Sequence, residues 1–477
     1  MLPGGTEMNR RGILFVLCLA LFLRLGYCLF LFAPLLENRG EELGWVMDGK
    51  LAVDPYDAIA RNLLAGKGYV DETGRRNLER LPLYPYLLVV IYKGFGSELW
   101  KLQVVQSLLD TLSCFLIFRL SLKTFRDPPA ALLAAALYAV YFKMIVTVAR
   151  PETETLYIFL LLVFLLVFVD SFARSDLAFL AGISLGLVTL VKPITLLFPA
   201  AAAGLYFFRS RVRRGEKILL LAAGFLVTIL PHLMNNYFQE GRPFYSSGGG
   251  KMLYMGAVID YSKNFREEES RLIREINSRY SFSHSLEDDH ELGRMAVRSI
   301  LNNPIDFLKR LALRTYLFWT YPDYSTTLMA LKTILILLFN GLLLLLAARG
   351  FHLSRKRRLF YEPFLLLFLY VYSAYVITYA YSRYSLPLFP ILFIFSSYEV
   401  VHLVKASGSL RRNLVPGRGD QQPDSRSSNV FAIWVRRISA GPGLNPNSWR
   451  RLMSSRNRAL ASAAGMEGGP VTSTSLA

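Results

Sequence analysis

The sequence has little charge and few cysteines. Only 19% of its 477 residues are charged, whereas 53% are hydrophobic. This balance excludes a disordered protein, and it is too apolar for an ordinary soluble enzyme. The three cysteines, Cys18, Cys28 and Cys114, lie inside apolar segments and show no spacing typical of a metal site. Their odd number and their positions argue against a disulfide framework.

The apolar residues occur in blocks close to the roughly 20 residues that a helix needs to cross a bilayer. We therefore predict an all-α polytopic membrane protein with about ten transmembrane helices. The first block follows Arg10 and Arg11 and is interpreted as an uncleaved span. The predicted spans are 12–33, 100–120, 130–149, 155–173, 177–191, 193–208, 218–234, 326–348, 359–379 and 385–404.

The formal net charge of +19 is concentrated in the C-terminal tail and in short loops between spans. The tail, 405–477, holds 11 basic and three acidic residues. If the N-terminus is cytoplasmic, the largest basic clusters and the tail all fall on the cytoplasmic side, as the positive-inside rule expects. This pattern indicates orientation in the cell (inner or plasma) membrane rather than a surface that binds nucleic acid.

Composition divides the chain into four parts. Residues 1–234 form an N-terminal membrane part that includes an acidic first outer loop, 34–82. The polar segment 235–325 is long enough for a small cap domain on the outer face. Residues 326–404 supply the C-terminal transmembrane helices, and the tail from 405 to 477 is predicted to be disordered and cytoplasmic.

The first outer loop contains three carboxylates, Asp48, Asp54 and Asp57. The apolar pattern from 56 to 64 predicts a short amphipathic helix, and the apolar stretch 83–95 is too short to span and is predicted to lie at the interface. An Asp just before the helix would sit at its positive end, which favours the ionised carboxylate. The alternative interpretation of such an Asp is a helix N-cap.

Further ionisable groups lie near the predicted outer face, where charged side chains are functional candidates. They are Arg80 in RLPLYPYL, Glu152 and Glu154 in ARPETETLY, Lys192 before a proline, and Arg383 in YSRYSLPLFP. Each has a simpler interpretation, as a solvated carboxylate at a helix start or as a cation that anchors a helix end. Taken together, the cations are suited to hold an anionic group such as phosphate.

Other motifs carry a weaker signal. His284 and His290 flank three carboxylates, but an exposed acidic helix start explains this pattern better than a metal site. The segment SSGGGK at 246–251 lacks the spacing of a phosphate-binding loop and is interpreted as a turn.

Three further features concern the helices themselves rather than catalysis. Gly182 and Gly186 form a GxxxG pattern that predicts a helix contact. Arg24 and Lys143 lie inside spans and are expected to pair internally rather than to take part in catalysis. Asn303 and the proline after it predict the start of a helix.

Over residues 12–404 the ordered motifs resemble polytopic glycosyltransferases of the GT-C type. The resemblance is to the branch that contains aminoarabinose transferases and protein O-mannosyltransferases. Its motifs are YDAIARNLLAGKGY, RLPLYP, TETLY, LAGISLGLVTLVKP, NNYFQEGRPFYSSGGGKMLYMGA, NNPIDFLKRLALRTYLFW and RYSLPLFP.

The resemblance implies transfer of a sugar from a polyprenyl-phosphate carrier to a glycan, lipid or protein acceptor on the outer face of the membrane. An Asp of the first outer loop would act as general base, because the acceptor hydroxyl must lose its proton as the new bond forms. The departing phosphate needs positive charge near it. The roles implied are base for Asp54 or else Asp48, carrier-phosphate binding for Arg80, Lys192 and Arg383, and contact with substrate or metal for Glu154, Asp57, Tyr56 and Tyr384.

The sequence departs from the family pattern in the spacing around the proposed base. Asp54 lies two residues before Tyr56, where the family usually has an acidic residue about four before it. Lys192 and Asn235 stand where arginine is more frequent, and lysine cannot form the bidentate fork. No cofactor is assigned from the sequence, and a divalent metal stays open.

Two alternatives use the same kind of carrier. One is a transporter or flippase for lipid-linked saccharides, and the other is a polymerase or ligase of surface polysaccharide. A transporter should show polar residues near the bilayer midplane and broken helices in two related halves. The sequence shows no convincing internal repeat, and its charged candidates gather at one edge, which favours chemistry at a surface.

Overall fold

The computed structural model describes residues 3–32, 46–47, 50–51, 55–259, 265–320 and 327–413. Within it, Ile13–Leu414 form one compact unit. The predicted bases Asp48 and Asp54 lie outside the described residues, as does most of the predicted tail.

Long apolar helices form the membrane part, which confirms the predicted all-α polytopic class. The N-terminal helices are α1 (Pro3–Gly26) with its π-helical continuation η1 (Tyr27–Phe32), α5 (Leu99–Phe125), α6 (Pro128–Val140), α7 (Phe142–Thr147), α8 (Glu154–Ser171), α9 (Leu177–Thr189), the 3₁₀ turn η2 (Pro193–Thr195), α10 (Phe198–Arg209) and α11 (Arg214–Glu240). The C-terminal ones are α16 (Thr327–Lys356), α17 (Glu362–Ile377), the 3₁₀ segment η3 (Ser382–Leu388) and α18 (Phe389–Asn413).

Fewer helical segments reach the full length of a membrane span in the described residues than the ten spans predicted from the sequence. Within the described residues, six helical segments are long and apolar enough to cross a membrane, and five apolar segments are shorter. Each predicted span coincides with a helix or with two helices in sequence, but the count of ten stays a prediction. Helix α18 continues beyond the predicted start of the tail at 405 and ends at Asn413.

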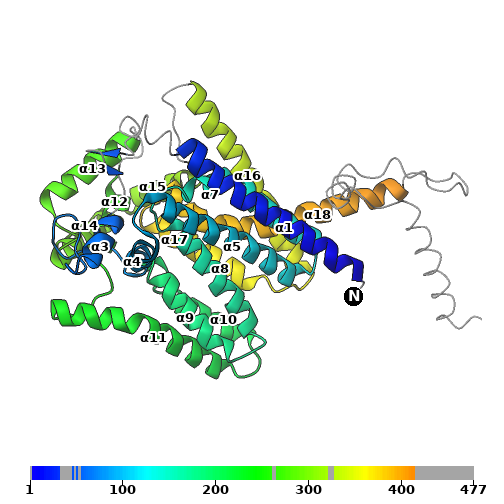
Figure 1. Ribbon diagram of the computed structural model, residues 1–477, viewed down its shortest axis with the longest axis horizontal. Coiled ribbons are helices and arrows are strands. Elements are labelled where there is room, and N and C mark those ends of the chain that lie inside the picture. Colours follow the sequence, from blue (N-terminus) through cyan, green and yellow to red (C-terminus); the bar gives the residue numbers. More distant parts are fainter. Residues whose placement is uncertain are drawn as a thin grey trace, which may run out of the picture. The chain divides into compact units, whose positions relative to one another are not determined.

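The polar segments fold into shorter elements that gather at one end of this unit (Figure 1). They comprise the two-residue strands β1 (Val46–Met47) and β2 (Lys50–Leu51), and the helices α3 (Tyr56–Leu64), α12 (Gly249–Val258), α13 (Phe265–Arg279), α14 (Leu286–Asn302) and α15 (Pro304–Trp319). The short apolar helix α4 (Leu83–Phe95) packs against α3. Strands β1 and β2 pair antiparallel. A small apolar core of their own holds α12, α13 and α14 together. Helix α3 has the bounds that the amphipathic pattern predicted, and α15 begins at the predicted proline.

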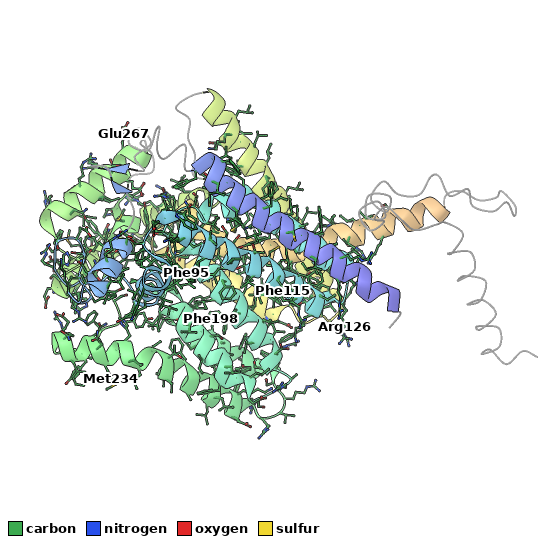
Figure 2. The ribbon with its side chains drawn as sticks, in the orientation of Figure 1. Phe95, Phe115, Arg126, Phe198, Met234 and Glu267 are labelled. Atoms are coloured by element: carbon green, nitrogen blue, oxygen red, sulfur yellow. The ribbon has the colours of Figure 1, made fainter. Side chains whose placement is uncertain are left out.

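Glycines allow α9 and α11 to pack closely, as the GxxxG pattern predicted. A Cβ atom at Gly182 would lie 2.2 Å from the carbonyl oxygen of Leu221, and one at Gly224 would lie 2.1 Å from that of Phe179. Neither backbone can give way without moving a helix. Such small residues hold membrane helices together, because lipid supplies no hydrophobic drive between them. The helices also have an inner and an outer face: Phe198 of α10 is buried, whereas Met234 projects outward from α11 (Figure 2).

A buried ion pair joins α1, α5 and α6. The Arg24 guanidinium pairs with Asp110 and also donates hydrogen bonds to the carbonyl oxygens of Ala20 (3.0 Å) and Ala139 (2.9 Å). The Tyr138 hydroxyl donates to the same Asp110 carboxylate. The expected internal pairing of Arg24 is therefore confirmed, although the sequence did not single out Asp110 as its partner.

Replacing Gly182 with alanine should destabilise the protein, because the new methyl group meets the backbone of α11. We expect a loss of about 1–3 kcal/mol, the usual range for overpacking. Gly204→Ala in α10 is the matched control, since nothing lies within 4 Å of a Cβ placed there. Thermal unfolding of both variants in detergent measures the difference, and equal stability of the two would contradict the packing argument.

Candidate active site

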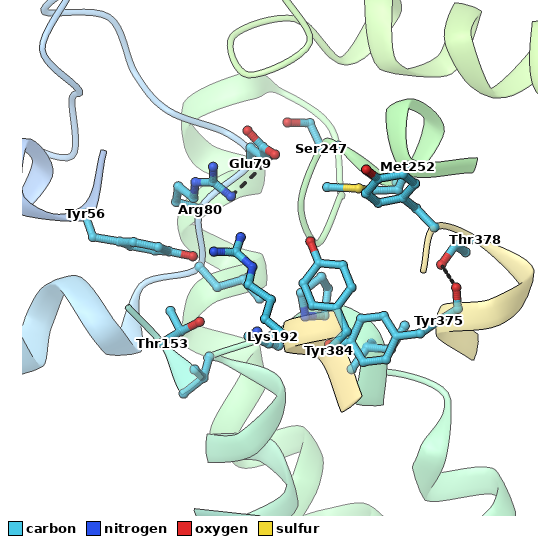
Figure 3. Close-up of a pocket in the computed structure, with 18 residues that line it drawn as sticks. Tyr56, Glu79, Arg80, Thr153, Lys192, Ser247, Met252, Tyr375, Thr378 and Tyr384 are labelled. Atoms are coloured by element: carbon cyan, nitrogen blue, oxygen red, sulfur yellow. Dashed lines mark hydrogen bonds and ion pairs between the residues drawn. The ribbon is translucent and has the colours of Figure 1, made fainter. Parts of the chain in front are cut away.

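A cavity of about 300 Å³ lies where the polar elements meet the ends of the apolar helices. We call it the central cavity. Five residues singled out from the sequence line it: Tyr56, Arg80, Lys192, Arg383 and Tyr384. They come from the first loop, the break after α9 and the segment before α18, which are far apart in the sequence but face one space in Figure 3, where all but Arg383 are labelled.

Two interruptions of the helices place cations beside this cavity. Helix α9 ends at Thr189, and Lys192 has extended backbone (φ −140°, ψ 129°) before Pro193 begins η2. Proline lacks a backbone N–H and disfavours helical backbone at the residue before it, which accounts for the extended conformation of Lys192. A 3₁₀ segment before α18 likewise carries Arg383 and Tyr384.

The buried carboxylate of Glu154 binds these cations. Glu154 is only 2% exposed and lies in the first turn of α8, where the helix dipole favours a negative charge. Its Oε1 accepts a hydrogen bond from Lys192 Nζ at 2.8 Å and lies 3.7 Å from Arg383 Nε. Arg383 also contacts Glu152 at 3.5 Å. The interpretation of Glu154 as a solvated helix-start carboxylate is therefore wrong.

Arg80, from the first loop, also lines the central cavity. Its guanidinium lies 5.3 Å from the centre of the Tyr56 ring, within cation–π range, and 3.5 Å from the Glu79 carboxylate. The Asn77 side chain accepts hydrogen bonds from the backbone N–H groups of Glu79 and Arg80 and thereby shapes the turn before α4. The backbone N–H of Leu83 donates to Leu190 at 3.2 Å, which ties this loop to the break after α9.

Two tyrosine rings lie within cation–π range of the lysine, and a third ring stacks on one of them. Lys192 Nζ lies 5.6 Å from the centre of the Tyr157 ring and 5.3 Å from that of Tyr384. Tyr375 stacks on Tyr384, with ring centroids 4.6 Å apart and planes 12° apart. The sequence did not single out Tyr157 or Tyr375, because a tyrosine inside an apolar helix carries no local signal of a site.

The glycine-rich segment also borders the central cavity, and interpreting it only as a turn missed this. Gly248 has a left-handed backbone (φ +90°), and α12 begins directly after it. Ser247 and Gly249 line the cavity. The backbone N–H of Ser247 donates to Leu78, whose own N–H donates to Ser283. The first loop is therefore hydrogen-bonded on both sides to segments of the predicted cap.

Asp57 lies elsewhere. Its two carboxylate oxygens accept hydrogen bonds from Arg61 Nε (2.7 Å) and from the Tyr92 hydroxyl (2.6 Å), and Asp57 is not among the residues that line the central cavity. The bond from Arg61 lies within α3, and the bond from Tyr92 joins α3 to α4. Asp48 lies outside the described residues.

His284 links the cap to the first loop rather than to a metal. Its Nδ1 contacts the carbonyl oxygen of Arg76 at 2.8 Å, and its Nε2 lies 3.2 Å from the Asp71 carboxylate. As predicted, an acidic helix start follows, with Ser285 capping α14. Within the described ranges, no three His, Cys, Asp or Glu side chains gather as a metal site would require.

The charges lining and bordering the central cavity are nearly matched. In the described part of the chain, the cations Arg80, Lys192 and Arg383 each contact one or two of the carboxylates of Glu79, Glu152 and Glu154. Such pairing holds the cations in place before any ligand arrives, which is the kind of preorganisation that stabilises developing negative charge. The arrangement is suited to bind an anionic group in a cavity with aromatic walls.

Comparison with known proteins now gives the class. Residues 79–234 match the model of a family described as dolichyl-phosphate-mannose-protein mannosyltransferase. The fold is similar to that of the archaeal oligosaccharyltransferase AglB from Archaeoglobus fulgidus, solved with an inhibitory peptide and a dolichol-phosphate, at a TM-score of 0.51 and 13% identity. That alignment covers 92% of this chain and 55% of AglB, so the chain spans little more than half of that relative.

A second solved structure is more distant. ArnT from Cupriavidus metallidurans, bound to undecaprenyl phosphate, aligns over 76% of each chain with 14% identity and a TM-score of 0.31. No curated protein sequence matches the chain. Together, the family match and the AglB fold confirm the resemblance to GT-C glycosyltransferases that the motifs predicted. The chain is a multi-pass membrane protein with this fold.

Replacing Asp71 with asparagine should weaken the link between the first loop and the cap. Burial alone would raise the pKa of Asp71, but hydrogen bonds from Thr73 and Asn77 and the charge of His284 lower it below its usual value of 3.8. A carboxylate with a lowered pKa stabilises the fold above its usual pKa, and this contribution is lost as the pH falls through the lowered value.

We therefore expect Asp71→Asn to cost about 1–3 kcal/mol near pH 7. The difference from wild type should shrink as the pH falls below 3.8 and through the lowered pKa, where the Asp71 carboxylate takes up a proton in the native protein as well. Thermal unfolding of wild type and Asp71→Asn from pH 7 downward measures this difference in stability. Glu72→Gln, at an exposed neighbouring residue, is the control. A difference that stays constant down to low pH would contradict the assigned role of the carboxylate.

Proposed function

We propose that this protein is a membrane glycosyltransferase that moves a sugar from a polyprenyl-phosphate carrier to a glycan, lipid or protein acceptor on the outer face of the membrane. The observation that carries the proposal is the convergence of Arg80, Lys192 and Arg383 on one cavity beside the first loop. The GT-C fold and the family match support the same reaction, as does the dolichol-phosphate in the AglB structure.

The reaction balances with groups on this chain. The acceptor hydroxyl attacks the anomeric carbon and passes its proton to an aspartate carboxylate. The bond from the anomeric carbon to the phosphate oxygen breaks, and its electron pair stays on the phosphate. The leaving phosphate then bears more negative charge, which Arg80, Lys192 and Arg383 are placed to stabilise. Tyr56, Tyr384 and Glu154 would shape the cavity around the sugar.

The length of the chain favours Asp54 as the base over Asp48. Tyr56 lines the central cavity, and two residues of chain reach at most about 7 Å. Asp54 is thus the candidate that lies closer in the sequence to a residue of the cavity wall. Asp48 is eight residues from Tyr56 in the sequence, so its separation from Tyr56 sets no comparable limit.

Asp54→Asn should abolish most transfer while leaving carrier binding intact, since removing a general base typically costs about 100- to 10,000-fold in rate. Asp48→Asn should retain most of the activity, and Asp176→Asn, an exposed residue paired with Arg174, is the matched control. Transfer from synthetic polyprenyl-phosphate sugars by the purified protein measures these rates.

Loss of transfer in Asp48→Asn but not in Asp54→Asn would reverse the assignment of the base. If the wild-type protein binds the carrier but moves it between leaflets without transferring sugar, the transporter interpretation replaces the enzyme.

Arg80→Gln should weaken carrier binding, because Arg80 is placed to bind the phosphate directly. We expect a loss of about tenfold or more, the value of one charge-assisted hydrogen bond. Arg80→Lys should recover part of it, since lysine keeps the charge but not the fork. Arg75→Gln, an exposed arginine of the same loop, is the control. Unchanged binding of a polyprenyl phosphate by Arg80→Gln would remove Arg80 from the proposed site.

A further inference from the structure

A second cavity, of about 210 Å³, lies beside the central one. We call it the lateral cavity. It is formed by α7 and η3, and Arg383 lines both cavities. The other side chains that line it and matter here are Phe142, Lys143, Val146, Ser382 and Leu386.

Lys143 is the notable group of the lateral cavity. Its Nζ is buried and has no hydrogen-bond partner among the described residues, contrary to the expected internal pairing. Lys192 of the central cavity, by contrast, is bound to Glu154 at 2.8 Å. Lys332 of α16 adds a further positive charge to the surroundings of Lys143. A buried ammonium group without a partner is costly in a membrane protein, so an anion is the expected occupant.

The other side chains of the lateral cavity indicate which kind of molecule carries this anionic group. Phe142, Val146 and Leu386 are apolar, and the Phe142 ring is 64% exposed on the protein surface. A soluble anion would gain nothing from such side chains. A lipid with a phosphate head group provides a charge for Lys143 and Arg383 and a hydrocarbon chain for the apolar side chains.

We propose that the lateral cavity binds the phosphate of a lipid between Lys143 and Arg383, at a site separate from the central cavity. Arg383 then lies between two anion sites, and its contacts with Glu152 and Glu154 hold it at their common wall. The inference goes beyond the proposed function, because lipid binding here does not require sugar transfer.

Farnesyl phosphate is a suitable probe, with farnesol and inorganic phosphate as comparisons. Native mass spectrometry of the full chain should show two molecules of farnesyl phosphate bound to the wild type. Lys143→Met should lose one of them, with affinity at that site reduced by about tenfold or more. Lys143→Arg should keep it. Lys93→Met, an exposed lysine near the end of α4, is the matched control.

Lys143→Met also has a result that does not depend on ligand. Because methionine replaces an unpaired buried charge by an apolar chain of similar length, the ligand-free variant should unfold at the same temperature as wild type or higher. Equal numbers and affinities of bound farnesyl phosphate in wild type and Lys143→Met would overturn the proposal. Inorganic phosphate binding as tightly as farnesyl phosphate would overturn the assignment to a lipid.

The proposed carrier site and the proposed lateral site can be tested independently. Arg80→Gln should weaken binding in the central cavity by about tenfold or more and leave the affinity at Lys143 unchanged. If Arg80→Gln binds both molecules with the affinities of wild type, the proposed carrier site is wrong while the lateral site stands. Photocrosslinking of wild-type protein with a diazirine analogue of farnesyl phosphate needs no variant. Adducts on Phe142–Thr147 or Ser382–Leu388 that unlabelled farnesyl phosphate suppresses are expected, and their absence would overturn the proposal.

Discussion

A carboxylate that is removed from solvent must be balanced by nearby positive charge, and in this protein that requirement applies to Glu154. Its partners Lys192 and Arg383 come from two segments at which regular helix is interrupted. Irregular backbone at membrane depth is tolerated where it lines a polar cavity. The interruptions, the ion cluster and the central cavity therefore depend on one another. If α9 ran on as regular helix past Lys192, the lysine would lose the extended backbone from which it contacts Glu154.

The two cavities differ in how their charge is balanced. Around the central cavity every described cation contacts a carboxylate, so an arriving phosphate must share cations that are already held in position. In the proposed reaction this competition would limit the affinity for the carrier phosphate and favour release of the product. Lys143 of the lateral cavity has no such competitor among the described residues. Arg383, at the common wall, couples the two sites, because an anion on either side alters its balance with Glu152 and Glu154.

Local features of the fold were predictable from the sequence, whereas partners across the fold were not. The bounds of α3 follow from an amphipathic repeat, and the packing of α9 on α11 follows from a GxxxG pattern. The pairing of Glu154 with Lys192 joins residues 38 positions apart, and nothing in an apolar helix specifies which neighbour it meets. For the same reason Asp110 was missed as the partner of Arg24, and Lys143 was expected to have a partner that the described residues do not supply.

The position of the ion cluster favours surface chemistry over passage through the membrane. A transporter must expose its binding site alternately to both sides, and such sites lie near the bilayer midplane between related halves. Here Glu154 is in the first turn of α8, at the end of a span. The loop before α4 and the start of α12 cover the same end of the central cavity and are hydrogen-bonded to each other through Leu78 and Ser247. Segments that line one end of a site can limit the access of water to it, and the proposed transfer to an acceptor other than water would benefit from that limit.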